Sequence, residues 1–81
     1  MSKILIVFRS THGAIKAEKA LINAAIACTV IPVPRHISAE CGIAIEINEA
    51  DTRTAHALLL KQSIPVAMYH ENGERYDIEE G

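Results

Sequence analysis

The sequence predicts an α+β fold: a ferredoxin-like split β-α-β sandwich of order βαββαβ with an additional C-terminal β-ribbon strand. Three observations lead to this prediction: a short stretch near the start that is apolar on both faces, two segments with helical spacing of apolar residues, and an Asn-Gly turn near the end. The chain has 81 residues, which suffices for one small core. We therefore expect residues 1–81 to form a single domain.

Residues 4–8 are five consecutive apolar residues, and this indicates a strand buried on both faces in the middle of a sheet. Ser10 or Thr11 can cap the helix that follows, because either hydroxyl can accept a hydrogen bond from an amide at the helix start. We expect this helix over residues 13–27. At 100° per residue its apolar side consists of Ala14, Ala17, Leu21, Ala24 and Ala25.

A second strand is expected at residues 29–31. Pro32 and Pro34 cannot donate to a ladder, so this strand lies at the edge of the sheet or ends there. A loop over residues 35–42 follows. The next strand has one buried face, because three isoleucines alternate with smaller or polar residues in the run Ile43, Ala44, Ile45, Glu46, Ile47.

Asn48, with Asp51 three residues later, forms an imperfect capping box for a second helix that runs to about Lys61. A fourth strand is expected over residues 64–69. The Asn72-Gly73 pair is a strong two-residue hairpin signal, and it leads into the terminal ribbon at residues 75–78. The buried side of the second helix is expected to contain Ala55, Leu58 and Leu59.

Charge and composition exclude several classes of function. The formal net charge is −2, so no basic excess exists to neutralise a row of phosphates, and nucleic acid is not expected as a partner. The longest apolar run is too short to span a bilayer, and the start lacks the pattern of a secretory signal. We therefore expect a cytoplasmic protein with no membrane partner, in which Cys28 and Cys41 are reduced thiols.

The predicted topology brings two irregular segments to one edge of the sheet. The loop at residues 35–42 and the turn into the first helix both follow strand ends that point the same way. Arg35, His36 and Cys41 are therefore expected beside Arg9 and His12. Functional residues are often found where loops meet on a rigid scaffold.

Cys41 stands in a polar loop and is reactive only where its thiolate is populated. At a pKa of ~8.5 about 3% is ionised at pH 7, and a pKa of ~7 needs ~2 kcal/mol of differential stabilisation. A helix N-terminus supplies only ~0.3–1 kcal/mol at an exposed site. Arg35, Arg9 or protonated His12 would have to contribute, whereas Glu40 would oppose ionisation. The alternative is that Cys41 is a half-buried turn residue without special reactivity.

Cys28 follows an alanine and precedes a strand, which favours a buried, inert thiol, although a resolving role stays open. His12, His36 and Cys41 provide three conceivable metal ligands, but no spacing typical of zinc sites occurs. We expect neither a metal nor another cofactor.

Two charged residues have an open interpretation. Glu18 lies at the margin of the apolar side of the first helix, where it either extends to solvent along the helix flank or pairs with Arg9 or Arg35. Arg35 follows a proline, and its guanidinium either binds an oxyanion or a carboxylate or is simply solvated.

Three strings of the sequence resemble the selenium/sulfur carrier protein-like family of small bacterial domains. They are residues 8–14, residues 17–19 and residues 31–43, and the most specific part is the Pro-Arg-x-Ile-Ser-x-x-Cys-Gly segment at residues 34–42. The resemblance covers about residues 3–70. It implies that Cys41 accepts sulfur or selenium, as a persulfide or selenosulfide, from a cysteine desulfurase or a selenocysteine lyase and passes it to an unknown acceptor protein.

Three functions stay open. In the first the chain is a carrier rather than a true enzyme, with Cys41, Arg35 and His12 in the reacting site. In the alternative it is a non-catalytic interaction or regulatory module that forms a homodimer through its edge strand and terminal ribbon, with Cys41 incidental. Copper or zinc handling is a third possibility.

Overall fold

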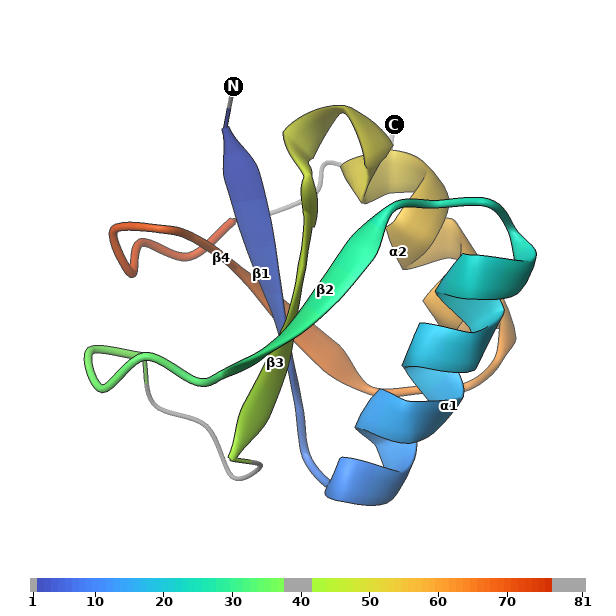
Figure 1. The fold of residues 1–81 in the computed structure, drawn as a ribbon, viewed down its shortest axis with the longest axis horizontal. Helices are drawn as coiled ribbons and strands as arrows, with labels where there is room; N and C mark the ends of the chain where they lie inside the picture. Colours follow the sequence, from blue (N-terminus) through green and yellow to red (C-terminus); the bar gives the residue numbers. More distant parts are fainter. Residues whose placement is uncertain (1, 38–41, 77–81) are drawn as a thin grey trace.

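The structure is a computed structural model and describes residues 2–37 and 42–76. It confirms the α+β class, with a four-stranded antiparallel sheet and two helices (Figure 1). A short 3₁₀ turn, η1, precedes the second helix. The elements in chain order are β1 (Lys3–Phe8), α1 (Thr11–Asn23), β2 (Cys28–Pro32), β3 (Ile43–Asn48), η1 (Glu49–Asp51), α2 (Thr52–Lys61) and β4 (Val66–His70).

The strands lie in the order β2-β3-β1-β4, and every neighbouring pair is antiparallel. β1 is therefore central, as its apolar residues predicted, and all five of residues 4–8 are buried. β2 lies at an edge of the sheet, as its prolines predicted. Neither helix of the described residues is long and apolar enough to cross a bilayer.

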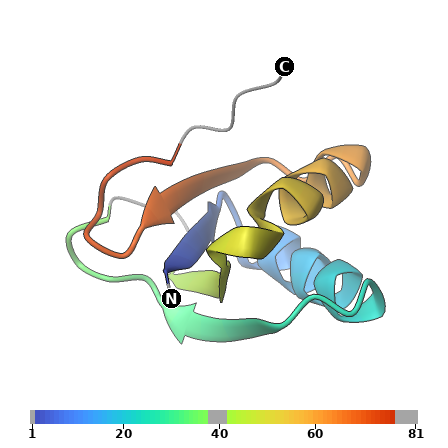
Figure 2. The same cartoon turned by 90° about the horizontal axis from the view of Figure 1, so that it is seen from above.

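The two faces of the sheet have separate cores. α1 and α2 cover one face (Figure 2), where alternate residues of β1 meet the apolar sides of the helices. The other face carries a smaller core, to which the connection between β2 and β3 contributes Ile37, only 4% exposed. The strand residues of this second core are Leu5, Val7 and Ala44.

α1 begins at Thr11 because Ser10 caps it: the Ser10 Oγ accepts a hydrogen bond from the Gly13 N–H at 3.2 Å. The predicted end at residue 27 is wrong. Ala25 adopts a φ of 58°, and the Ile26 N–H returns to the Leu21 carbonyl at 2.9 Å. These are the features of a Schellman motif, which ends a helix. Ala24 and Ala25 are consequently exposed and do not belong to the apolar side.

α2 begins without the predicted cap. Asn48 accepts a hydrogen bond from the Lys3 ammonium at 2.7 Å instead of bonding a helix amide. Inside the first turn, Thr52 donates its hydroxyl proton to the Glu49 carbonyl at 2.6 Å. Ala55 and Leu59 are buried as predicted, whereas Leu58 is half-buried.

A turn forms at Asn72-Gly73 as predicted, but its loop has three residues, 71–73, rather than two, because His70 pairs with Glu74. Gly73 has a φ of +93°, and the Asn72 side-chain oxygen accepts from the Glu74 N–H at 3.0 Å. Past the turn, the Tyr76 N–H donates to the Met68 carbonyl at 2.8 Å, so the chain runs back along β4. The described residues 75 and 76 form only an isolated bridge, between Arg75 and Tyr69, and not the predicted ribbon strand. The last residues of the predicted ribbon, 77 and 78, lie outside the described residues.

We predict that Ala25→Gly stabilises the protein by up to ~1 kcal/mol, because glycine adopts a left-handed φ without the steric cost that a Cβ imposes. The matched control is Ala24→Gly, whose φ of −89° needs no glycine. That change should cost about 0.5–1 kcal/mol of unfolding free energy. Urea denaturation measures both, and equal effects of the two substitutions would contradict the prediction.

Candidate functional site

Three strand ends meet at one end of the sheet. Val7 pairs with Ala44, and Pro32 pairs with Ile43, so β1 and β2 end where β3 begins. The Val33 N–H donates to the Gly42 carbonyl at 3.1 Å and continues the ladder between β2 and β3 by one pair. Cys41 lies outside the described residues, but its chain neighbour Gly42 is held by this bond.

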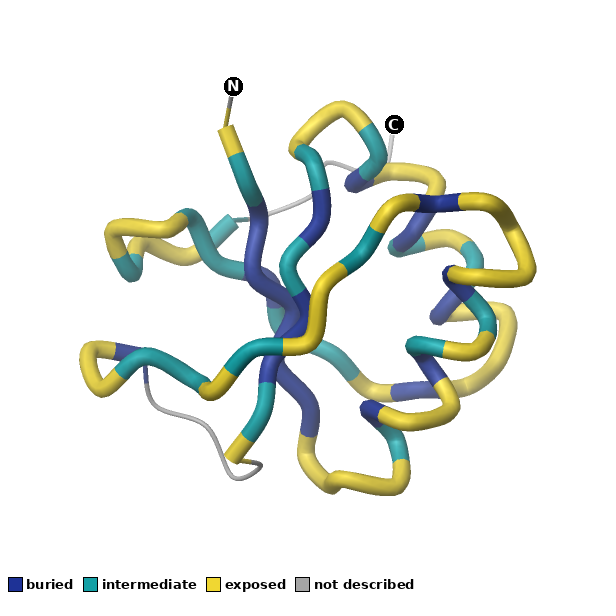
Figure 3. Tube along the Cα trace, viewed as in Figure 1, coloured by how far each residue is buried: buried dark blue, intermediate teal, exposed yellow. Residues whose placement is uncertain are grey.

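The described part of the connection, residues 33–37, runs along the second face of the sheet. Ile37 packs among residues of that face, and its N–H donates to the Pro34 carbonyl at 3.0 Å, which closes a tight turn. Arg35 and His36 lie in this turn and are both exposed (Figure 3). The burial of Ile37 therefore directs their side chains away from the core.

The sequence predicted His36 beside Arg9 and His12, but the structure places it elsewhere. Its Nε2–H donates to the Glu71 carbonyl at 3.1 Å, in the turn that follows β4. This turn lies near the start of β1, because the Lys3 N–H donates to the Glu71 carboxylate at 3.1 Å. His36 thus contacts the turn beside the opposite end of β1 from the one predicted. The cause is the apolar surface that Ile37 covers.

Arg35 and His12 are both exposed, and they lie on two different segments of the chain. His12 is in the first turn of α1, at the helix end where the backbone dipole is positive. Arg35 is in the turn of residues 33–37, in the connection between β2 and β3. The structure brings neither into a described contact with the other.

Cys28 begins β2 and packs against the helix-side core. Burial raises the pKa of its thiol, and the negative charge of Glu18 raises it further. Because the thiolate is the nucleophilic form, a raised pKa makes this thiol less reactive at neutral pH. The predicted inertness agrees with this environment, although the side chain is partly rather than fully buried.

Glu18 is half-buried on the flank of α1 that faces β2. Its charge influences Cys28 rather than the turn of residues 33–37. Of the two interpretations left open, the helix-flank position therefore fits the structure better than an anchor for Arg35.

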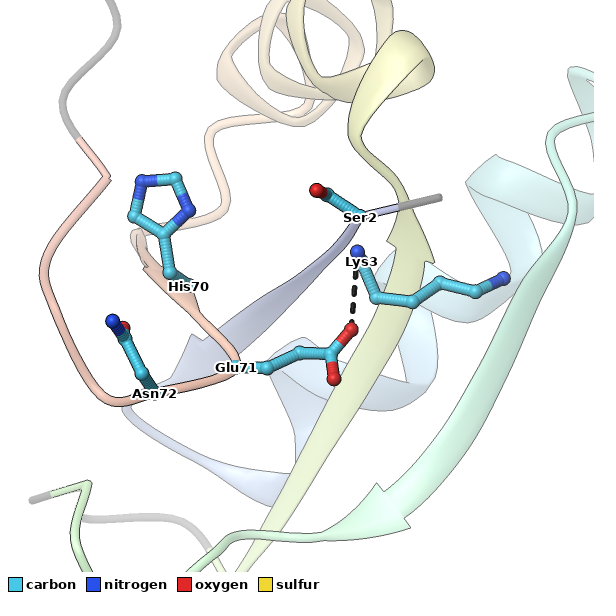
Figure 4. Close-up of a pocket in the computed structure, with 5 residues that line it drawn as sticks. All are labelled: Ser2, Lys3, His70, Glu71 and Asn72. Atoms are coloured by element: carbon cyan, nitrogen blue, oxygen red, sulfur yellow. Dashed lines mark hydrogen bonds between the residues drawn. The ribbon is translucent and has the colours of Figure 1, made fainter.

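A shallow polar pocket of about 310 Å³ lies at the opposite end of the sheet (Figure 4). In it the Glu71 carboxylate accepts a hydrogen bond from the backbone N–H of Lys3, whereas the Lys3 ammonium donates to Asn48. The Glu71 carboxylate therefore holds the β4 turn to the start of β1. Sequence reasoning missed this pocket, and only the Asn72-Gly73 signal pointed to a turn there. The lining residues are Ser2, Lys3, His70, Glu71 and Asn72.

The described residues show no arrangement of side chains that indicates a metal site. Within residues 2–37 and 42–76, no group of three or more histidine, cysteine, aspartate or glutamate side chains is placed to hold an ion. His36 is turned toward Glu71, so it does not join His12.

Comparison with known proteins gives one match. The model of the family described as "Putative Se/S carrier protein-like" matches residues 3–71, which is most of the chain. The matched range includes Arg35, Cys41 and His12. No curated protein and no solved structure shows significant similarity to the chain.

We predict that Gly73→Ala destabilises the protein by about 1–3 kcal/mol, because an alanine there is strained at positive φ. Its Cβ would also lie 2.5 Å from Cδ2 of His36. In a His36→Ala background the contact is absent and only the backbone strain remains, so the cost should be smaller. A double-mutant cycle in urea measures the difference. An equal cost in both backgrounds would show that His36 does not occupy this position.

We predict that Cys28 has an alkylation pKa above that of an ordinary cysteine. In a Cys41→Ser protein only Cys28 remains, and its reaction with iodoacetamide should be slow at pH 7 and accelerate at alkaline pH. Glu18→Gln should lower the pKa by removing the nearby charge, whereas Glu74→Gln, in the β4 turn, should leave it unchanged. Rapid alkylation at pH 7 would argue against the raised pKa.

Proposed function

The chain belongs to the Se/S carrier protein-like family, and on that premise we propose that it carries sulfur or selenium covalently on Cys41. The observation that carries this proposal is the family match, which spans residues 3–71 and so includes the whole segment around Cys41. The environment of Cys28 supports it, because a thiol with a raised pKa competes poorly for an electrophilic sulfur.

The proposed transfer is a thiol–disulfide type exchange. The Cys41 thiolate attacks the terminal sulfur of a persulfide on the donor enzyme. A new S–S bond forms on Cys41 as the S–S bond of the donor breaks, and the donor cysteine leaves as a thiolate. The transferred sulfur keeps its oxidation state, so no external oxidant or reductant is needed. Delivery to the acceptor repeats the exchange in the opposite sense.

The donor in this proposal is a cysteine desulfurase or a selenocysteine lyase, and the acceptor is a second protein. A cytoplasmic location suits this chemistry, because reducing conditions keep Cys41 as a thiol before loading.

Arg35 and His12 have supporting roles in the proposed transfer. Arg35 is exposed six residues before Cys41, and its guanidinium is a permanent positive charge that favours a thiolate. His12 is also exposed and can give or take a proton near neutral pH. The positive end of α1 acts in the same direction as both.

The fold suits a carrier because both sides of the segment that holds Cys41 are anchored. Ile37 is buried on one side of the segment, and the Gly42 carbonyl is hydrogen-bonded to β2 on the other. We assign the overall arrangement to the ferredoxin-like, split β-α-β type, in which a rigid sheet supports its connecting loops.

The second candidate is an interaction module in which Cys41 has no chemical role. The exposed edge strand β2 favours it, since edge strands bind further strands. The two candidates differ in the alkylation pKa of Cys41. A pKa well below 8.5 supports the carrier, whereas an ordinary value near ~8.5 supports the interaction module.

We predict that Cys41→Ser abolishes sulfur loading. The full chain is incubated with a cysteine desulfurase and cysteine, and intact-mass spectrometry without reductant then detects the added sulfur atom. The wild-type chain and Cys28→Ser should gain one reducible sulfur, whereas Cys41→Ser should gain none. Loading of the Cys41→Ser protein, or no loading of the wild type by either a desulfurase or a selenocysteine lyase, would refute the carrier function.

A further inference from the structure

Four large apolar side chains are strongly exposed in the part of the chain that the structure describes, and three lie on one side of the molecule. Ile15 is 50% exposed, Ile22 60% and Val30 41%. The fourth, Leu60, is 62% exposed and belongs to α2. We call the region formed by Ile15, Ile22 and Val30 together with the free edge of β2 the α1–β2 surface.

The two isoleucines face the same way because they are seven residues apart, or two turns of helix. Glu18 lies between them on this flank of α1, and its charge acts on Cys28 at the start of β2. The flank therefore faces β2. Val30 shares a sheet face with Cys28, since side chains two apart in a strand point the same way. Figures 1 and 2 show α1 and β2 on the same side of the molecule.

The outer edge of β2 presents backbone groups that no described strand pairs, because β2 pairs with β3 alone. The hydrogen bond from the Val33 N–H to the Gly42 carbonyl shows which residues of β2 direct their backbone groups toward β3. Residues two apart share the same direction in an antiparallel ladder, so Thr29 and Ile31 bond to β3. The N–H and C=O groups of Cys28 and Val30 point outward, as does the Pro32 carbonyl.

We propose that the α1–β2 surface binds a second copy of this chain, so that two β2 strands join antiparallel and form one continuous eight-stranded sheet. The register that overlaps the whole of both strands places Val30 opposite Val30. In this register each Val30 N–H donates to the other Val30 carbonyl, and each Cys28 N–H donates to the Pro32 carbonyl of the other copy. Pro32 has no N–H, but here its carbonyl alone is used.

The pattern on α1 fits its own copy better than an unrelated protein. A two-fold axis perpendicular to the joined sheet makes the two α1 helices antiparallel on the same face. Ile15 of one copy then approaches Ile22 of the other, and Glu18 approaches Lys19. The midpoint of each pair along the helix falls between residues 18 and 19. One two-fold arrangement therefore forms the apolar contact and the charged contact together. A chain of this size also buries a smaller share of its surface by itself than a larger domain does, roughly 60–65%.

The proposed dimer does not depend on the proposed carrier chemistry. The α1–β2 surface is on the helix side of the sheet, whereas residues 33–37 lie on the other face. The inference therefore stands independently of the sulfur chemistry.

The test measures the mass of the full chain by sedimentation equilibrium over a concentration series. The wild type should approach twice 8.8 kDa. Val30→Lys should weaken association at least about tenfold, because two like charges meet at the axis. Val30→Pro should do the same by removing an outward N–H that β3 does not use, and Ile22→Lys by removing the helix contact. Leu60→Lys is the matched control and should leave the dimer unchanged, with circular dichroism confirming that each variant folds.

A wild type that stays at 8.8 kDa up to about millimolar concentration, which corresponds to a binding free energy weaker than about −4 kcal/mol, would overturn the proposal. A dimer that tolerates Val30→Lys, Val30→Pro and Ile22→Lys would also overturn it. The same holds for a dimer that only Leu60→Lys disrupts, because the contact would then involve α2.

Discussion

The burial of β1 on both faces is the constraint on which the rest of the structure depends. A strand with apolar residues at every position must be covered from two sides. α1 and α2 cover one side. The chain has no further helix among its described residues, so the connection between β2 and β3 contributes Ile37 to the other side. The packing of Ile37 against Leu5 and Val7 therefore determines the path of this connection. The positions of the exposed side chains beside Ile37 follow from that path.

Local patterns in the sequence predicted the elements well and their ends less well. Continuous apolarity identified β1, prolines identified the edge strand, and Asn72-Gly73 identified a turn, since each of these signals acts through its own backbone. The end of α2 was predicted at Lys61, where the structure has it, whereas α1 ends at Asn23, before the predicted residue 27. Beyond the two helices, Ala25 and Ser63 occupy left-handed positions where glycine is usual. The buried residue that follows each of them, Ile26 and Ile64, returns its N–H to the helix and stabilises that conformation. The cause is tertiary, so residue type alone did not reveal it.

The candidate site could be predicted only in part for the same reason. Topology placed the ends of β1 and β2 at the start of β3, and the strand register agrees. It could not place His36, whose position follows from the burial of its neighbour Ile37 and from a backbone carbonyl at Glu71. A loop residue can thus be correctly identified as exposed while its contacts remain unpredictable, because they depend on which apolar side chain of the loop enters the core.

Cys28 shows how burial and a neighbouring charge can make a thiol structural rather than reactive. Cys28 is the first residue of β2, and its side chain packs against the core near Glu18. Burial and the negative charge of Glu18 therefore both disfavour the Cys28 thiolate. Moving a reactive thiol into that position would need a cation in place of Glu18, on a flank whose apolar neighbours Ile15 and Ile22 suit protein contact. The described part of the connection between β2 and β3 instead carries the exposed Arg35, a positive charge of the kind that favours a thiolate. The proposed dimer surface contains neither Arg35 nor His12, so a change there need not alter the residues proposed to support transfer.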